Sequence, residues 1–390
     1  MSDLRVRHDR LTVYTYIGLT AYVWAMYALG PSLLLLRIEQ GTSRTISSLH
    51  SSALSIGVLV LGMAGARITA RLGRALTIRS GQLLVVAGVL LVLFGPSPLV
   101  SIPGGFLIGF GGAAATNASN AFLTLHHGRA GAAAISESNT YAALAALVAP
   151  LLVGAMVAWQ FSWRWGMGAS VAIFALAQFF GRDGHALEVR GPEHHDVGTR
   201  LPALYWWAWV LMGLNIGTEF SFMLWSGDLL RERAGFSTAA AAAGLGAVTA
   251  GMMVSRAAIP ALLRRYDSEW LLRLSILVPL VMWVPLWLST NGLVMLTSMF
   301  VMGCGIGFHF PMGMSRMLDA APGMADLAAA RSAVASGGAG SILPFLLGAA
   351  ADAIGMHAAF TLVPLLLAGA WIIARRFPVP RPQHPLPARE

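Results

Sequence analysis

Long apolar runs alternate with short polar or Gly/Pro-rich segments along the whole chain. Each run holds roughly 18 or more mostly apolar residues, enough for a helix to cross a hydrocarbon core about 30 Å thick. The runs lack the alternating polarity of barrel strands, and a backbone in lipid must satisfy its own hydrogen bonds. The pattern predicts an all-α integral membrane protein with twelve transmembrane helices, near residues 12–36, 46–66, 78–95, 101–124, 132–157, 165–181, 203–226, 237–260, 270–289, 293–316, 327–350 and 357–375.

The longest polar segment follows the sixth run and separates six runs from six. Short motifs repeat across it in the same order: APLLVG at 149–154 matches LPFLLG at 343–348, and GFGG at 109–112 matches GCGI at 303–306, both 194 residues apart. Such ordered matches indicate an internal duplication of six-helix units. We therefore expect an N-terminal six-helix bundle at 1–180, a cytoplasmic linker at 181–202 and a C-terminal six-helix bundle at 203–390.

Composition agrees with a membrane protein and excludes several kinds of chemistry. The chain is 56% hydrophobic and 11% charged, whereas a soluble domain is typically about 25% charged. All 26 basic residues are arginine, which removes the lysine of a Walker A loop or of a Schiff base. The single cysteine, Cys304, excludes an intramolecular disulfide, and no HExxH, GxSxG or paired-cysteine zinc pattern is present. We expect no enzyme activity, no cofactor and no bound metal.

The arginines are distributed unequally between the two sides of the predicted membrane. With the N-terminus inside, 21 arginines, Arg256 among them, fall on the cytoplasmic side. This positive-inside bias predicts a multi-pass protein of the cell inner membrane with both termini in the cytoplasm. It also accounts for the net charge of +9, and without an aromatic-interleaved basic module we expect no nucleic-acid partner. The remaining five, on the outer side, are Arg37, Arg44, Arg164, Arg231 and Arg233.

This organisation resembles the major facilitator superfamily of secondary transporters, and the resemblance covers essentially the whole chain. The loop between the second and third spans, GARITARLGRAL at 65–76, is similar to the signature loop of that family. Ala70 stands where the family usually has an aspartate, which departs from the charge-relay latch that the loop is thought to form in many members. The matching positions are Gly65, Arg71, Gly73 and Arg74.

The fifth span bears on the direction of transport. It carries LVAPLLVG at 147–154, a reduced version of the glycine-proline motif associated with drug-antiporter branches of the family. Ala149 replaces the glycine before Pro150, and Val153 replaces the first of the paired glycines. The reduced motif favours uptake. Aromatic and methionine-rich lining in spans one, seven and ten would suit a greasy substrate, so efflux of a hydrophobic compound stays open.

Glu219 interrupts the seventh span and has no basic residue within eight positions on either side. A charge at a helix centre costs roughly 2.5–3.5 kcal/mol, so such residues usually face a cavity or a partner. At helical spacing it shares a face with Asn215 and Phe222. Glu219 is therefore a candidate proton-binding residue of a central cavity. The alternative is a carboxylic acid hydrogen-bonded to a neighbouring helix for packing.

Other polar and aromatic residues inside the spans are candidates for binding substrate or proton. Trp24, at the repeat-equivalent position of the first span, and Tyr27 could stack a flat or cationic substrate, although such aromatics more often pack. His309 in the tenth span could share a proton or donate to substrate, or pack as a satisfied histidine. Asn117 and Asn120 lie three residues apart on one helix face and could line the cavity or bond across helices.

Glu137 and Arg331 lie 194 residues apart, at equivalent positions near the cytoplasmic starts of spans five and eleven. The resemblance implies that these two helices approach each other when the cytoplasmic side is closed. The pair is therefore a candidate inside gate, made in the outward-open state and broken in the inward-open one. Alternatively, Arg331 orients the helix and Glu137 favours a helix start. Arg331 could also hold an anionic substrate.

Together these features predict a secondary active transporter of a small organic solute that works by alternating access. We expect coupling to a proton through Glu219, or to another ion, and uptake rather than efflux. We also expect a monomer embedded in the lipid bilayer. The alternative from another class is a transport-inactive membrane sensor or scaffold, for which the missing aspartate at Ala70 is the only hint.

Overall fold

The computed structural model of the protein describes residues 6–181, 187, 200–322 and 324–379. Within these residues the regular secondary structure is entirely helical, as the apolar runs predict. The elements are α1 (Arg10–Gln40), α2 (Arg44–Leu72), α3 (Arg74–Phe94), α4 (Pro98–His127), η1 (Gly128–Ala130), α5 (Gly131–Ala158), α6 (Arg164–Gln178), α7 (Ala203–Ala234), α8 (Thr238–Gly244), α9 (Gly246–Leu263), α10 (Ser268–Leu288), α11 (Gly292–Ile306), α12 (His309–Asp319), α13 (Ala325–Ile354), α14 (Met356–Ala359) and α15 (Leu362–Arg376).

The helices reproduce the twelve predicted spans, but three spans are interrupted. The eighth is divided into α8 and α9, the tenth into α11 and α12, and the twelfth into α14 and α15. By length and hydropathy alone, ten helical segments of the described chain could cross a membrane. The other two are α6, with 15 residues, and α7, with 32 residues. Tryptophans and the polar residues around Glu219 lower the hydropathy of α7.

The ends of α1 follow from local sequence. Asp9 caps its start, because an Oδ1 atom of Asp9 accepts a hydrogen bond from the Thr12 amide at 2.8 Å. Partial burial opposes ionisation of Asp9, but hydrogen bonds from Thr12 and His126 outweigh it and hold the pKa of this carboxyl below its usual value. The helix ends at Gly41 with φ 61°, and α7 ends at Gly235 with φ 66°. Both glycines take the left-handed conformation that ends helices without strain, and they too are 194 residues apart.

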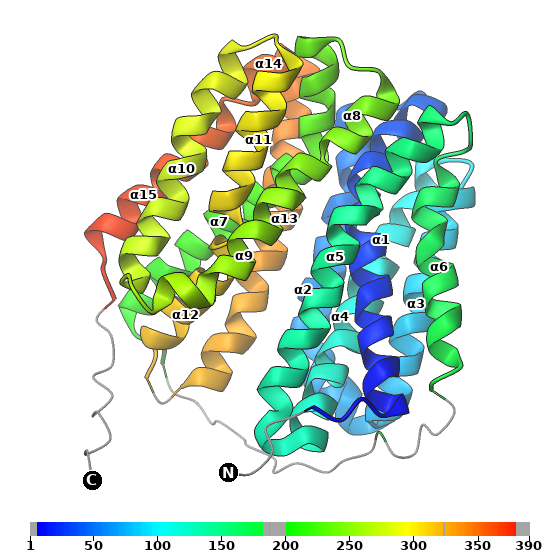
Figure 1. Ribbon diagram of the computed structural model, residues 1–390, viewed down its shortest axis with the longest axis vertical. Helices are drawn as coiled ribbons and strands as arrows, with labels where there is room; N and C mark the ends of the chain where they lie inside the picture. Colours follow the sequence, from blue (N-terminus) through cyan, green and yellow to red (C-terminus); the bar gives the residue numbers. More distant parts are fainter. Residues whose placement is uncertain (1–5, 182–186, 188–199, 323, 380–390) are drawn as a thin grey trace.

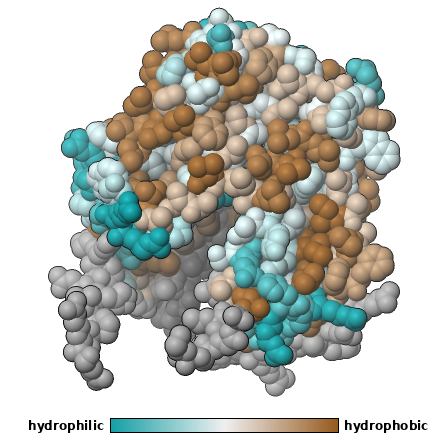
Figure 2. Space-filling model, in the orientation of Figure 1, coloured by the Kyte–Doolittle hydropathy of each residue, from teal (hydrophilic) through white to brown (hydrophobic). Residues whose placement is uncertain are grey.

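Figure 1 shows two groups of helices, which we call the first half (α1–α6) and the second half (α7–α15). The halves meet where α2 packs on α13, α5 packs on α8 and α9, and α1 packs on α7. We call the end where α1 begins and α15 ends the termini side, and the other end the far side. In Figure 2 hydrophobic residues cover the middle of the visible face, as expected for a surface in contact with lipid.

Polar contacts join the halves on the far side. Arg37 of α1 forms an ion pair with Asp228 of α7, and Arg44 of α2 pairs with Glu232. Asp352 of α13 accepts hydrogen bonds from the backbone amides of residues 44 and 45, at 3.1 and 2.8 Å. On the termini side, no ion pair between described residues joins the halves, and the helix ends diverge in Figure 1. This conformation is therefore closed on the far side.

Close helix crossings inside each half depend on glycine. A Cβ atom on Gly109 of α4 would lie 1.9 Å from the carbonyl oxygen of Leu54 in α2, and one on Gly57 would lie 2.4 Å from that of Phe106. Small residues let helix backbones approach this closely in membranes. The same contacts recur 194 residues later, between α9 and α11. There the pairs are Gly303 with Val248, at 2.2 Å, and Gly251 with Phe300, at 2.1 Å.

We expect Gly109→Ala to destabilise the protein by about 1–3 kcal/mol, because the added methyl group overlaps backbone and must push α2 and α4 apart. Thermal unfolding of the detergent-purified protein measures the effect. Gly338→Ala is the matched control, since a Cβ at this helical glycine of α13 meets no described atom within 4 Å. It should leave stability unchanged or raise it by up to about 1 kcal/mol. Equal melting temperatures for the two variants would contradict the prediction.

Candidate functional site

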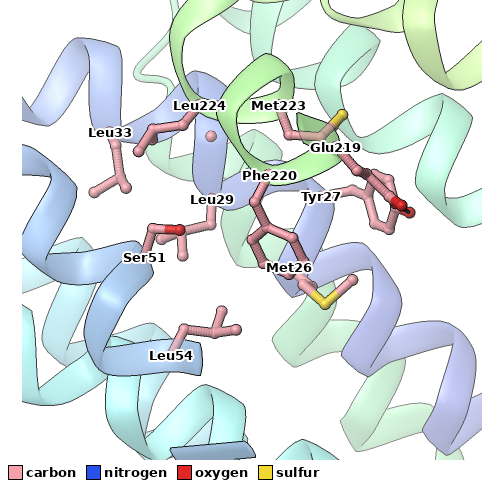
Figure 3. Close-up of a pocket in the computed structure, with 11 residues that line it drawn as sticks. Met26, Tyr27, Leu29, Leu33, Ser51, Leu54, Glu219, Phe220, Met223 and Leu224 are labelled. Carbon is pink, nitrogen blue, oxygen red and sulfur yellow. Dashed lines mark hydrogen bonds between the residues drawn. The ribbon is translucent and has the colours of Figure 1, made fainter. Parts of the chain in front are cut away.

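Glu219 lies at the junction of the halves and is 8% exposed. The hydroxyl of Tyr27, from α1, donates a hydrogen bond to Glu219 Oε1 at 3.4 Å. Nη2 of Arg256, from α9, lies 3.9 Å from the same oxygen. Figure 3 shows the carboxylate turned toward Tyr27, at one edge of a small cavity. Three side chains from three helices and both halves thus meet at one point.

The cavity beside Glu219 is small and mostly apolar. Its volume is about 40 Å³, enough for a few water molecules but far below the roughly 300–1,000 Å³ of a site that holds an organic ligand. It is lined by Met26, Tyr27, Leu29, Gly30, Leu33, Ser51, Leu54, Glu219, Phe220, Met223 and Leu224. The halves must therefore move before a solute can occupy this place.

A second, smaller space also borders Tyr27. It measures about 10 Å³ and is lined by Tyr27, Ala143, Ala146, Thr249, Met252, Met253 and Arg256. Tyr27 belongs to the walls of both spaces. The acid thus lines the first space and the arginine lines the second, and this tyrosine borders both.

Arg256 is held by a break in the tenth span. Pro311 has no backbone N–H, so the carbonyl of Gly307, four residues earlier, has no helical donor. Arg256 Nε donates to that carbonyl at 3.4 Å. A charged pair inside a membrane protein is costly unless both members have partners. The break between α11 and α12 supplies one partner for Arg256, and Glu219 supplies the other.

The sequence groups Arg256 with the orienting arginines of a cytoplasmic segment, but a second relationship was not predicted. Arg256 is within α9, where it faces Glu219. In the sequence Arg256 falls inside the predicted span 237–260, and its nearest charged neighbour is Arg264, eight residues later. Because this position is near the end of the predicted span, it also suits an orienting arginine, and the sequence alone does not separate the two roles.

The polar residues predicted around Glu219 are buried in the second half instead. His309 is fully buried, and its Nε2 lies 3.2 Å from the Ser275 carbonyl oxygen, so no contact with Glu219 is present in this conformation. Asn215 is also fully buried, and its amide nitrogen and oxygen have no hydrogen-bond partner among the described residues. Phe222 packs edge-on against Phe360, with ring centroids 5.5 Å apart. It therefore lies in the core and not in the cavity.

Trp24 does not face Glu219. Its indole N–H donates to the carbonyl of Gly166 in α6 at 2.8 Å, which fixes the ring within the first half. It lines a separate groove of about 570 Å³ between α1, α5 and α6. Asn117 is exposed and Asn120 half-buried on α4, and neither lines the two spaces beside Tyr27. Of the predicted aromatic and amide residues outside α7, only Tyr27 reaches the acid.

Glu137 and Arg331 are not paired in this conformation. Glu137 accepts hydrogen bonds from His8 Nε2 at 2.9 Å and from the Tyr16 hydroxyl at 3.3 Å. Arg331 is exposed at the termini side of α13, and its carbonyl accepts from Trp209 Nε1 at 2.9 Å. Glu137 lies near the start of α5 in the first half, and Arg331 lies near the start of α13 in the second half.

The predicted signature loop forms the tight connection between α2 and α3. Gly65 is inside α2 and Arg71 is in its last turn. Gly73 joins the helices with φ 79°, a value that glycine adopts without strain. Arg74 begins α3, and its Nη1 lies 3.5 Å from the carbonyl of Leu187. The loop thus contacts the one described residue of the central polar segment 182–199; the other residues of that part of the predicted linker lie outside the described residues.

Solved structures with the same fold are transporters. A bacterial homolog of the human lysosomal transporter Spinster, inward-facing and unoccupied, matches with a TM-score of 0.72 and 12% identity over 96% of this chain and 98% of its own. The peptide transporter POT in complex with sulfate matches with a TM-score of 0.75 and 13% identity, over 95% of this chain and 94% of its own. The nucleoside transporter NupG matches with a TM-score of 0.70 and 12% identity, over 94% of this chain and 97% of its own.

Sequence comparison gives the family. No curated protein matches the chain. The family model of the Major Facilitator Superfamily matches residues 15–343, most of the sequence. With the transporter fold and the helical membrane architecture, this match shows that the chain belongs to the major facilitator superfamily of secondary transporters.

Proposed function

We propose that this protein moves a small organic solute across the cell inner membrane by alternating access, and that a proton on Glu219 drives the cycle. The observation that carries the proposal is the meeting of Glu219, Tyr27 and Arg256 at the junction of the halves. In a secondary transporter an ionisable residue at this place is a natural coupling site, because its charge can alternate between paired and protonated forms.

The three residues divide unequally between the halves. Arg256 and Glu219 both belong to the second half, whereas Tyr27 belongs to the first. Protonation of Glu219 removes its attraction to Arg256 and weakens its hydrogen bond from Tyr27, because a charged acceptor bonds more strongly than a neutral one. A proton at this site therefore changes a contact between the halves. This is what coupling between protonation and movement requires.

We place both termini in the cytoplasm on the strength of the arginine distribution. In this orientation the far side is periplasmic, and the conformation is inward-open. The units that move are the bundles at 1–180 and 203–390. When the cytoplasmic side closes, Glu137 and Arg331 come together as the inner gate, and Glu137 exchanges His8 for Arg331.

Uptake is the direction that we favour, because the fifth-span motif of drug antiporters is reduced here. Efflux of a hydrophobic compound is the second candidate, supported by the four methionines and four leucines around the junction. A transport-inactive sensor would show no solute exchange at all.

The test uses proteoliposomes and a panel of labelled amino acids, sugars, nucleosides, organic acids and hydrophobic amines. Counterflow identifies a solute that the protein exchanges. A pH gradient of about one unit should then make the wild type accumulate that solute about tenfold, since one proton crossing it supplies about 1.4 kcal/mol. Glu219→Gln should still exchange the solute but reach equal concentrations on both sides.

The control is Glu39→Gln, which removes an acid paired with Arg164 on the far side within the first half. It should accumulate solute as the wild type does. Accumulation by Glu219→Gln equal to that of the wild type would disprove proton coupling at this residue. The sign of the pH gradient that drives accumulation distinguishes uptake from efflux. If no solute of the panel is exchanged, the transport-inactive sensor is favoured.

A further inference from the structure

Arg256 is a half-buried arginine of α9 that faces the junction of the halves. Its Nε is engaged by the Gly307 carbonyl, while Nη2 lies 3.9 Å from Glu219, beyond hydrogen-bonding distance. The side chain is 35% exposed. The Gly307 carbonyl thus orients the guanidinium group through Nε. The Nη2 end is close to Glu219 but is not joined to it by a pair of hydrogen bonds. Such a group can accept another oxyanion.

We infer that Arg256 binds the carboxylate of an organic anion, which crosses the membrane together with the proton on Glu219. This inference rests on the proposed function and adds the chemical class of the substrate. In the empty protein Arg256 pairs with Glu219. When Glu219 takes up a proton, Arg256 exchanges this partner for the carboxylate of the solute. When the solute leaves, Glu219 releases its proton and the original pair forms again.

Charge balance at the junction favours an anion over the alternatives. A closed site in the membrane interior is most stable when its charges cancel, because unpaired charge there is costly. Arg256 keeps its positive charge at every physiological pH, whereas Glu219 can be neutralised. A monoanion and a proton therefore give a neutral loaded site. An organic cation would leave net positive charge whether Glu219 is protonated or not.

Glu219 is the only acid among the described residues that line the two spaces. Among the described residues that line the two spaces, α1 contributes Tyr27, α2 contributes Ser51, and α9 contributes Thr249 beside Arg256. Helix α5 contributes alanines, and the rest of α7 contributes Phe220, Met223 and Leu224. From α12, the ring of His309 is directed to Ser275 instead. The apolar remainder suits the hydrocarbon part of a small organic acid.

The test compares three probes of nearly equal shape and different charge: benzoate, benzamide and benzylamine. Binding to the purified full-length protein is measured by scintillation proximity with each labelled probe, at mildly acidic and mildly alkaline pH. Benzoate should bind the wild type, and more tightly at acidic pH, by up to about tenfold for each pH unit. Benzamide and benzylamine should bind at least about thirtyfold more weakly than benzoate.

Two variants separate the roles of the acid and the arginine. Glu219→Gln should bind benzoate with the affinity of the acidic wild type at both pH values, because Arg256 then has no competing carboxylate. Arg256→Gln in the Glu219→Gln background should lose at least about thirtyfold in benzoate affinity. This double variant leaves no unpaired charge at the junction, so it should fold. Arg164→Gln, at an exposed ion pair on the far side, is the control and should bind as the wild type does.

The inference fails if benzylamine or benzamide binds as tightly as benzoate, if no probe binds the Glu219→Gln protein, or if the double variant binds benzoate as well as Glu219→Gln does. None of these results bears on proton coupling, which the accumulation ratio in proteoliposomes tests separately. Conversely, benzoate binding that depends on Arg256 but not on pH would support the anion site and contradict proton coupling at Glu219.

Discussion

Asp228→Asn is expected to drive the protein out of the conformation described here. The variant leaves Arg37 without its carboxylate on the far side, where the two side chains are 10% and 4% exposed. Breaking a buried ion pair by removing one partner costs about 3–5 kcal/mol. The pair joins α1 to α7, so separation of the halves lets water reach Arg37 and relieves the penalty. The equilibrium between the two conformations should move by about a hundredfold to several thousandfold.

Cysteine labelling measures this shift. Leu34 of α1 is buried, and its side chain lies beside Gly227 of α7 on the far side. In a Cys304→Ala background, Leu34→Cys should react with a membrane-impermeant maleimide much faster when Asp228→Asn is present. Combining Asp228→Arg with Arg37→Asp should restore slow labelling, because it rebuilds the pair in reverse. Unchanged labelling in Asp228→Asn would show that this pair does not hold the far side closed.

Glu39→Gln is the matched control. The Glu39–Arg164 pair lies on the same side but within the first half, and its side chains are 41% and 34% exposed. Exposed pairs contribute about 0–1 kcal/mol. This variant should therefore leave the labelling rate unchanged. The contrast between the two acids separates the closure of the halves from a general loss of charge on the far side.

The helices were predictable because hydrophobicity is a local property of the chain. Each predicted span is found within a few residues, and the 194-residue repeat extends to individual backbone contacts such as Gly109 with Leu54 and Gly303 with Val248. The interruptions of three spans were not predicted. At Gly307 the cause is a missing donor at Pro311, which breaks a helix without changing its hydropathy.

The candidate site was predictable only in part, for a related reason. Glu219 is conspicuous because a carboxylate in an apolar run differs from its sequence neighbours. Its partner is Arg256, 37 residues later, and a relationship between distant helices leaves no local signal. Trp24 is a candidate from the internal repeat, and Phe222 from helical spacing. Spacing gives the residues that share a face, but which neighbour that face contacts depends on packing.

Gate residues are difficult to predict because each ion pair forms in only one conformation. The far-side pairs, Arg37 with Asp228 and Arg44 with Glu232, belong to the state in which that side is closed. The inner gate that we propose, Glu137 with Arg331, belongs to the other state. A single conformation displays only the contacts of its own state.

Glu269→Gln is expected to destabilise the second half by about 3–5 kcal/mol, as the loss of one partner of a buried pair does. Arg316 of α12 is 2% exposed by side chain and pairs with Glu269 of α10. It also donates to the Phe377 carbonyl just after α15, so one guanidinium group joins three helices on the termini side. The variant leaves this buried charge unpaired, and an arginine cannot lose its charge to relieve the penalty. Thermal unfolding of the purified protein measures the effect.

Arg273→Gln provides the comparison that assigns the loss to Arg316. Arg273 lies 3.8 Å from the same carboxylate, but its side chain is 38% exposed. Removing it should therefore cost less than about 1 kcal/mol. It also takes a like charge away from Arg316, which partly offsets the loss. If Glu269→Gln and Arg273→Gln lower the melting temperature equally, the buried pair is not what holds α10, α12 and the end of α15 together. A much larger effect of Glu269→Gln would identify this pair as the connection that holds these three helices together.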